Sequence, residues 1–239
     1  MPQFELNSFS SPEELAGRVA AQWRLEVQAR KSLESPYCVA LSGGRITRGF
    51  FSAAAKQAKD RSLSLDSVHF FWADERCVPP TDPECNFAIA RELLFAPLGI
   101  PEAQVHRIRG EDPPEAAAIH AEAEICRLAP LDGEGQPVLD LIFLGMGEDG
   151  HVASLFPGEP EAVMASKAVY RPVTAAKPPP RRITLGYSAI AAARQVWVLV
   201  SGPGKENALR ESLSPVGLTP LARVLCSRAH TRIFTDLPS

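Results

Sequence analysis

The chain has 239 residues, 45% of them hydrophobic and 22% charged, so it is long enough to bury a sizeable core. Its net charge of −3 argues against a protein that coats nucleic acid or lies on a membrane surface. Any anionic ligand must therefore be held by a local cluster of cations and backbone N–H groups.

Taken in chain order, the apolar patterns predict alternating helices and strands. The first half gives a helix over about 12–33 capped by Ser11 and Glu14, a strand over 37–44, a helix over 50–60, a strand over 67–75, and helices over 85–98 and 115–129. The second half gives strands over 138–147, 168–173 and 181–187, a helix over 188–194, a strand over 195–202, a helix over 204–213, and strands, or a strand and a loop, over 223–227 and 230–236.

The strands are continuously apolar, which indicates a mainly parallel sheet covered by helices on both faces. We therefore expect an α/β fold with a doubly wound sheet. No repeat and no break in composition marks a linker, so one domain spanning residues 1–239 is expected.

The spacing of the cysteines and the first residues of the sequence bear on the cellular compartment of the protein. Cysteines 38, 77, 85, 126 and 226 are dispersed without a C-x-x-C pair, which indicates reduced thiols and neither a disulfide framework nor a zinc site. The start MPQFELNSF resembles no signal peptide, and no apolar run approaches the roughly 20 residues of a membrane span. A cytoplasmic protein without membrane or nucleic-acid partners is expected.

Four polar segments follow predicted strands directly: SGGR (42–45), ADER (73–76), GEDGH (147–151) and SGPGK (201–205). Because ligands of such sheets bind outside the carboxyl ends of the strands, we expect these segments to share one site.

SGGR and ADER have an unremarkable interpretation as well as a functional one. Gly43 and Gly44, after Ser42, could bring backbone N–H groups to an anion that Arg45 and Thr47 also bind, or simply form a tight turn. Asp74 and Glu75 beside Arg76 resemble a surface ion-pair cluster, although a fixed guanidinium also suits an oxygen that gains negative charge.

GEDGH indicates a functional site more specifically than SGGR or ADER does. Its glycines allow a bend that turns His151 toward the ligand edge, and Asp149 is close enough to orient the imidazole. Farther along, Lys177, Arg181, Arg182 and Lys205 supply cations, and Lys205 opens a helix where a phosphate could bind. G-x-S-x-G and H-E-x-x-H are both absent, so neither a serine triad nor a metal site is predicted.

With ADERCV, DLIFLGMGEDGHVASLFPG, KPPPRRITL and GPGKENAL in this order, the sequence resembles the 6-phosphogluconolactonases of the sugar-phosphate isomerase/lactonase superfamily. The resemblance implies a parallel-sheet α/β fold and hydrolysis of 6-phosphoglucono-1,5-lactone in the oxidative pentose phosphate pathway. It implies no metal and no organic cofactor. The partner would be a sugar-phosphate lactone, and the chain a monomer or weak homo-oligomer.

The same resemblance assigns roles to the residues. His151 would deprotonate the attacking water with Asp149 near it, and Arg76 with Asp74 would face the lactone carboxyl end. The phosphate end would be formed by Ser42, Gly43, Gly44, Arg45, Arg182 and Lys205. Ile46 and Thr47 stand where the family has Thr-Pro, which puts the threonine contact to phosphate in doubt.

Two other functions remain as alternatives. A glucosamine-6-phosphate deaminase would have a glutamate just before the Pro-Gly of its histidine loop, where this chain has Phe156. A non-catalytic sugar-phosphate sensor would tolerate loss of His151 or Arg76, and both are present.

Overall fold

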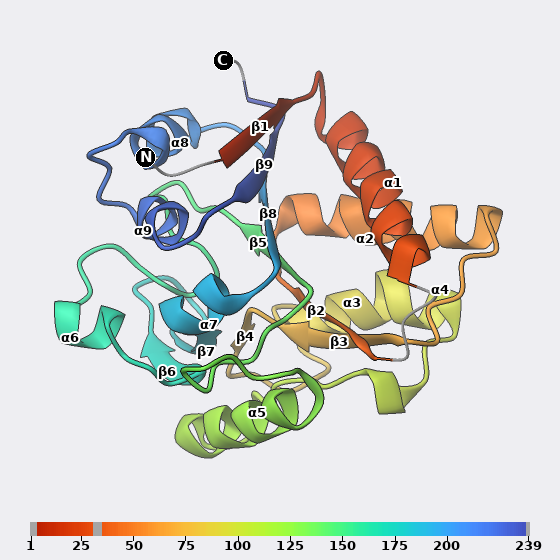
Figure 1. Cartoon of the computed structure of the whole chain (residues 1–239), viewed down its shortest axis with the longest axis horizontal. Coiled ribbons are helices and arrows are strands. Elements are labelled where there is room, and N and C mark those ends of the chain that lie inside the picture. Colours follow the sequence, from red (N-terminus) through yellow and green to blue (C-terminus); the bar gives the residue numbers. More distant parts are fainter. Residues whose placement is uncertain (1–3, 31–34, 238–239) are drawn as a thin grey trace.

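In the computed structural model, which describes residues 4–30 and 35–237, helices pack on both faces of a central sheet (Figure 1). The strands are β1 (Phe4–Ser8), β2 (Tyr37–Leu41), β3 (Val68–Trp72), β4 (Asp74–Arg76), β5 (Leu141–Gly145), β6 (Tyr170–Thr174), β7 (Arg181–Leu185), β8 (Gln195–Val200) and β9 (Thr231–Thr235). The helices are α1 (Pro12–Arg30), α2 (Arg45–Asp60), α3 (Asn86–Ala90), α4 (Ala96–Leu98), α5 (Pro114–Leu128), α6 (Glu161–Met164), α7 (Tyr187–Ala192), α8 (Glu206–Leu213) and α9 (Pro220–Cys226). A π-helical turn, η1 (Arg91–Phe95), joins α3 to α4, and a single 3-10 turn, η2 (Glu102–Gln104), follows.

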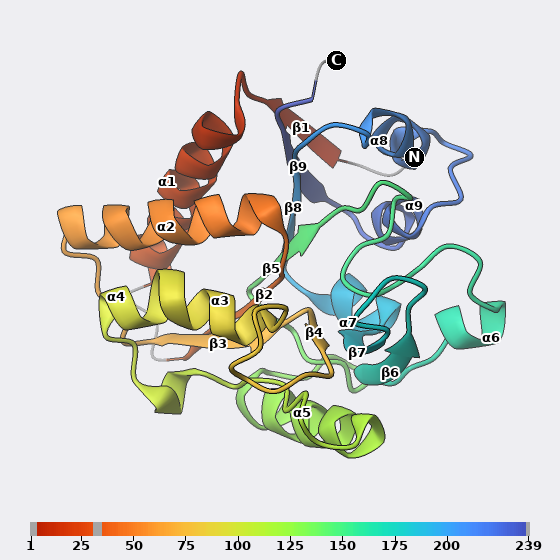
Figure 2. The same cartoon turned by 180° about the vertical axis from the view of Figure 1, so that it is seen from behind.

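Six strands of the described chain form the main sheet in the order β1-β9-β8-β5-β2-β3, and all their pairings are parallel. Helices α1, α2 and α3 cover one face, whereas α7, α8 and α9 lie on the other (Figures 1 and 2). The expected mainly parallel, doubly wound α/β fold is confirmed.

Buried aromatic rings fix the first two helices on the sheet. Trp23 of α1 meets Phe50 of α2, Phe70 of β3 and Phe143 of β5 edge-on, with centroid distances of 6.0, 6.4 and 6.3 Å. Each ring is at most 2% exposed. Edge-to-face pairs of this kind add to the free energy gained from burial, so the strand ends stand on a rigid base.

An ion pair ties the end of α1 to the start of β5. The carboxylate of Asp140, which is 6% exposed, accepts hydrogen bonds from the Arg30 guanidinium and from the Cys38 N–H. A buried carboxylate is tolerated because these donors replace the water that it loses.

A second, smaller sheet corrects the sequence interpretation. Strands β6 and β7, predicted as strands, do not join the parallel sheet; with β4 they form an antiparallel sheet in the order β4-β7-β6. Ala73 connects the two sheets, because its N–H donates to Leu41 O (2.7 Å) and its carbonyl accepts from Leu185 N (2.8 Å).

Other differences are local. Residues 223–227, for which a strand was one reading, form the end of α9 and the residue after it, whereas the strand expected over 230–236 is present as β9. Strand β1 was not predicted. Helix α1 begins as expected, since Glu14 N donates a hydrogen bond to Ser11 Oγ (3.2 Å). The Glu14 carboxylate, however, accepts hydrogen bonds from the N–H and hydroxyl of Ser10 and not from Ser11. The last residues of the predicted helix, 31–33, lie outside the described ranges. None of the described helices is long and apolar enough to cross a membrane.

Candidate active site

The carboxyl ends of β2, β5 and β8 and the small sheet meet around one pocket. Members of all four polar segments line it, together with β7: Ser42, Gly43, Gly44, Arg45, Ile46, Asp74, Arg76, Gly145, Met146, Gly147, His151, Ala153, Arg182 and Lys205. Of the residues to which the family resemblance assigns a role, all except Asp149 therefore border a single space, and Asp149 contacts His151. The further candidates Thr47, Lys177 and Arg181 do not line this pocket.

The loop after β5 is closed by its own hydrogen bonds. Gly147 N donates to His151 O (2.9 Å), and Gly150 N donates to Gly147 O (3.1 Å). Beyond the histidine, Ala153 has a φ of 50°, a conformation that costs free energy in a residue other than glycine. Such strain persists only where the surrounding contacts impose it, so this loop holds one conformation.

Two glycines of the loop are required by close approach. A Cβ on Gly147 would lie 2.1 Å from both Nδ1 and Cε1 of His151, so any larger residue would displace the ring. Gly150 has a φ of 77°, and a Cβ there would lie 2.6 Å from Thr219 Cβ. Leu221 N also donates to Gly150 O (3.1 Å), so the start of α9 supports the loop from behind.

His151 is held by a carboxylate. Its Nδ1 lies 2.5 Å from Asp149 Oδ1, and the His151 N–H reaches the same oxygen at 3.2 Å. Burial alone would raise the pKa of Asp149, but the hydrogen bonds from His151 and its charge outweigh burial, and the pKa is lowered. Because an ionised carboxylate can only accept, the proton of the neutral ring resides on Nδ1 and Nε2 is left as a base.

The ADER segment is not the surface ion-pair cluster that its sequence suggests. Asp74 and Glu75 are 4% and 1% exposed. Asp74 Oδ2 accepts from Ser154 Oγ (2.7 Å), which joins β4 to the histidine loop. The buried position is possible because β4 belongs to the small sheet, which sequence patterns did not predict.

Glu75 supports the pocket from beneath. Its carboxylate accepts hydrogen bonds from the N–H groups of Arg76 (2.7 Å), Asn86 (2.8 Å) and Phe87 (2.8 Å). Burial raises the pKa of Glu75 to about 7 although these three bonds oppose the rise. Burial and Glu75 also raise the pKa of the adjacent Cys85 thiol to about 12, so this cysteine is a thiol and not a reactive thiolate at neutral pH.

Two arginines stand side by side across the small sheet. Arg76 and Arg182 are register partners of β4 and β7. Nη1 of Arg76 donates to Glu84 O (2.9 Å) and forms an ion pair with the Glu84 carboxylate (3.3 Å), whereas its Nη2 has no hydrogen bond to any residue in the described ranges. Burial and the charge of Arg76 lower the pKa of Arg182, so an anion between the two guanidinium groups would be stabilised by both.

Lys205 and Arg45 form a second pair of cations. Lys205 immediately precedes α8, and burial followed by the charge of Arg45 lowers its pKa, against the opposing influence of Glu148 and Asp236. The pocket thus brings four cations together in a chain whose net charge is −3.

The glycine turn after β2 has a packing role that the sequence did not reveal. A Cβ on Gly43 would lie 2.0 Å from Oδ1 of the buried Asn86, so this glycine is needed whether or not an anion binds. Gly44, with a φ of 117°, precedes the first turn of α2. Thr47 Oγ1 donates to Gly43 O (3.0 Å) and the residue does not line the pocket. Its hydroxyl stabilises the turn.

Phe156 was noted in the sequence only as a missing acid, and the structure gives it a contact. Its ring centroid lies 5.0 Å from that of His151 and 5.7 Å from the Arg182 guanidinium carbon. It therefore packs between the imidazole and a pocket cation. Within residues 4–30 and 35–237 no three His, Cys, Asp or Glu side chains are grouped to hold a metal ion.

Comparison with known proteins gives a family match and relatives that bear the same name. Residues 10–233 match the family described as glucosamine-6-phosphate isomerases/6-phosphogluconolactonase. The 6-phosphogluconolactonase of Mycobacterium tuberculosis is 39% identical over 169 residues, which span 69% of this chain and 66%, just under two thirds, of that protein. That of Haemophilus influenzae is 34% identical over 206 residues, 85% of this chain and 83% of the relative.

Solved structures superpose on this chain over almost its whole length. The 6-phosphogluconolactonase of Trypanosoma brucei superposes with a TM-score of 0.85 at 26% identity, covering 98% of this chain and 96% of that one. A monomeric glucosamine-6-phosphate deaminase reaches a TM-score of 0.79 at 19% identity, covering 97% and 96%, which shows a shared fold and no more.

Proposed function

The chain belongs to the glucosamine-6-phosphate isomerase and 6-phosphogluconolactonase family, and from this premise we propose that it hydrolyses 6-phosphoglucono-1,5-lactone to 6-phosphogluconate. This is the lactonase step of the oxidative pentose phosphate pathway. The observation that carries the proposal is the Nδ1 contact of His151 with Asp149 (2.5 Å) in a pocket lined by four cations.

In the proposed reaction, Nε2 of His151 takes a proton from a water molecule while the water oxygen attacks C1 of the lactone. The carbonyl oxygen becomes an oxyanion, and the charge of Arg76 stabilises it. The bond between C1 and the ring oxygen then breaks, and the ring oxygen receives the proton from His151. This donation restores the neutral imidazole, and the new carboxylic acid loses its remaining proton to solvent.

Asp149 and Asp74 act through His151 and the loop that carries it. Asp149 fixes the tautomer of His151 and stabilises the imidazolium that forms after proton transfer. Asp74, through Ser154, holds the histidine loop against the strand that carries Arg76. A covalent nucleophile is not needed because the lactone is already reactive.

The phosphate is assigned to the glycine turn at Ser42–Gly44 with Arg45, Arg182 and Lys205. Burial leaves Arg182 and Lys205 incompletely solvated, so a dianion gains more from these two than from exposed cations such as Arg45. Binding energy at this remote group positions the lactone for attack.

Phe156 favours lactone hydrolysis over the deaminase activity of the same family. The position carries no acid or base, and its ring fills the space beside His151. Ring opening of an amino sugar followed by proton shuttling would lack a titratable group there.

The test is hydrolysis of freshly prepared 6-phosphogluconolactone, followed by acid release in weakly buffered solution. We expect turnover by the wild type and a loss of kcat of about 10²–10⁴-fold in His151→Ala. His230→Ala is the matched control, because His230 is exposed and distant in the fold from the pocket. Ammonia release from glucosamine 6-phosphate would identify a deaminase, and tight binding without turnover would identify a sensor.

A further inference from the structure

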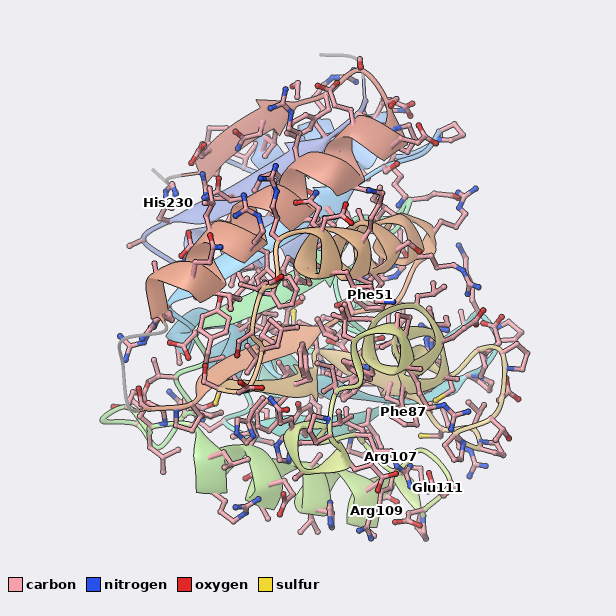
Figure 3. The ribbon with its side chains drawn as sticks, turned by 90° about the vertical axis from the view of Figure 1, so that its right-hand side faces the viewer. Phe51, Phe87, Arg107, Arg109, Glu111 and His230 are labelled. Carbon is pink, nitrogen blue, oxygen red and sulfur yellow. The ribbon has the colours of Figure 1, made fainter. Side chains whose placement is uncertain are left out.

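A second cavity, with a volume of about 790 Å³, lies at the outer edge of β3 between α3 with η1 and α5. It shares no lining residue with the pocket of His151. Figure 3 views this side of the molecule and shows Phe87, Arg107, Arg109 and Glu111 gathered there. Sites for small organic ligands commonly measure about 300–1,000 Å³, so this cavity is large enough for one.

Positive charge dominates the lining. Arg91, Arg107, Arg109 and Arg127 border the cavity, against Glu102 and Glu124. Two of the arginines are neutralised, Arg107 by a bidentate pair with Glu111 (2.6 and 2.8 Å) and Arg127 by Glu124 (2.9 Å).

The other two, Arg91 and Arg109, form no ion pair with any residue of the described ranges. In an acidic protein, two unpaired guanidinium groups at the rim of one cavity form a local anion site.

Flat uncharged rings line the same cavity. The guanidinium carbons of Arg91 and Arg107 each lie 5.8 Å from the ring centroid of Phe87. The ring of His106 stacks on Phe71 at 4.7 Å and hydrogen-bonds to His69 at 2.9 Å. Burial lowers the pKa of His69 and of His106, so these rings are neutral at physiological pH.

We propose that this cavity binds a nucleotide, with the base against the ring of Phe87 and the phosphates on Arg91 and Arg109. Guanidinium groups recognise phosphate oxygens bidentately and also stack on planar rings, so one residue type serves both parts of the ligand. The limited volume of the cavity and the negative net charge of the chain favour a single nucleotide over a polynucleotide.

The experiment is calorimetric titration of the full chain with ADP at low ionic strength, in the presence of saturating 6-phosphogluconate. We expect a dissociation constant of about 0.1 mM or below. The double variant Arg91→Gln/Arg109→Gln should weaken binding at least about tenfold, because it removes both charge-assisted contacts to the phosphates. Both side chains are exposed, so the fold should persist. Arg61→Gln, an exposed arginine at the end of α2, is the matched control and should bind like the wild type.

Adenosine and inorganic pyrophosphate, titrated separately, test the two halves of the ligand. Each should bind more weakly than ADP, since each engages only the ring or only the arginines. The proposal fails if ADP does not bind, if it binds only when 6-phosphogluconate is omitted, if the double variant binds as tightly as the Arg61→Gln control, or if adenosine alone equals ADP.

Discussion

Replacement of Gly147 by alanine tests whether the histidine loop delivers a correctly placed base. The added Cβ would lie 2.1 Å from Nδ1 and Cε1 of His151 and 2.8 Å from Asp149 Oδ1. Normal contact between such atoms needs about 3.5 Å, so the ring must move by roughly 1 Å or more. The backbone itself does not require glycine here, because the φ of Gly147 is outside the left-handed region.

The size of the effect follows from the displacement. A misplacement of about 1 Å can cost about 100-fold in rate, and complete loss of a general base costs about 10²–10⁴-fold, which corresponds to about 3–5 kcal/mol of activation free energy. We expect kcat of Gly147→Ala to fall within that range while the melting temperature changes by no more than a few degrees. Steady-state hydrolysis of the lactone and thermal unfolding measure the two quantities.

A double-mutant cycle then isolates the cause. If the methyl group acts only through the imidazole, Gly147→Ala combined with His151→Ala should be no slower than His151→Ala alone. Gly133→Ala is the matched control, because a Cβ at Gly133 meets nothing within 4 Å. Wild-type kcat in Gly147→Ala, or fully additive losses in the double variant, would refute the reasoning.

Three further outcomes are expected. Lys205→Ala and Arg182→Ala should raise KM far more than they lower kcat, since they hold a group present in both the ground and transition states; a fall in kcat alone would place that residue with the reacting carbonyl. Asp140→Ala should lower the free energy of unfolding by about 3 kcal/mol in urea titrations, because Arg30 loses its buried partner, and an unchanged midpoint would contradict this. The folded-state pKa of Glu75 is raised, so its contribution to stability is complete below pH 4.5 and is lost as the pH rises through about 7, amounting to about 3 kcal/mol. Urea titrations at pH 5 and pH 8 should show this loss in the wild type and not in Glu75→Gln; equal losses would exclude Glu75 as its source.

The main sheet could be predicted because its strands are buried on both faces and their sequences are continuously apolar. The strand β5, LIFLG, is the clearest example, with four of its five residues buried. The small sheet could not be distinguished in this way. Strand β4 has only the three residues Asp74–Arg76, all charged, and its burial depends on β7, which lies more than 100 residues later in the chain.

The site was predictable where a single segment carries the signal, and not where two segments meet. The bend at 147–151 follows from its glycines, and the structure places His151 against Asp149 as that pattern suggests. The contact of Gly43 with Asn86 and the hydrogen bonds from Asn86 and Phe87 to Glu75 depend on tertiary packing of α3 against β4 and the turn before α2. No periodicity in the sequence encodes them.

The place of β9 in the sheet has a consequence for synthesis on the ribosome. Strand β9 lies between β1 and β8, so Phe4–Ser8, made long before β9, has no neighbouring strand until Thr231–Thr235 has left the exit tunnel. Both termini of the described chain lie at this edge of the sheet, in the upper left of Figure 1. Until β9 is made, β8 is an unpaired edge of the sheet, and a premature stop before residue 231 would leave that edge exposed to association with other chains.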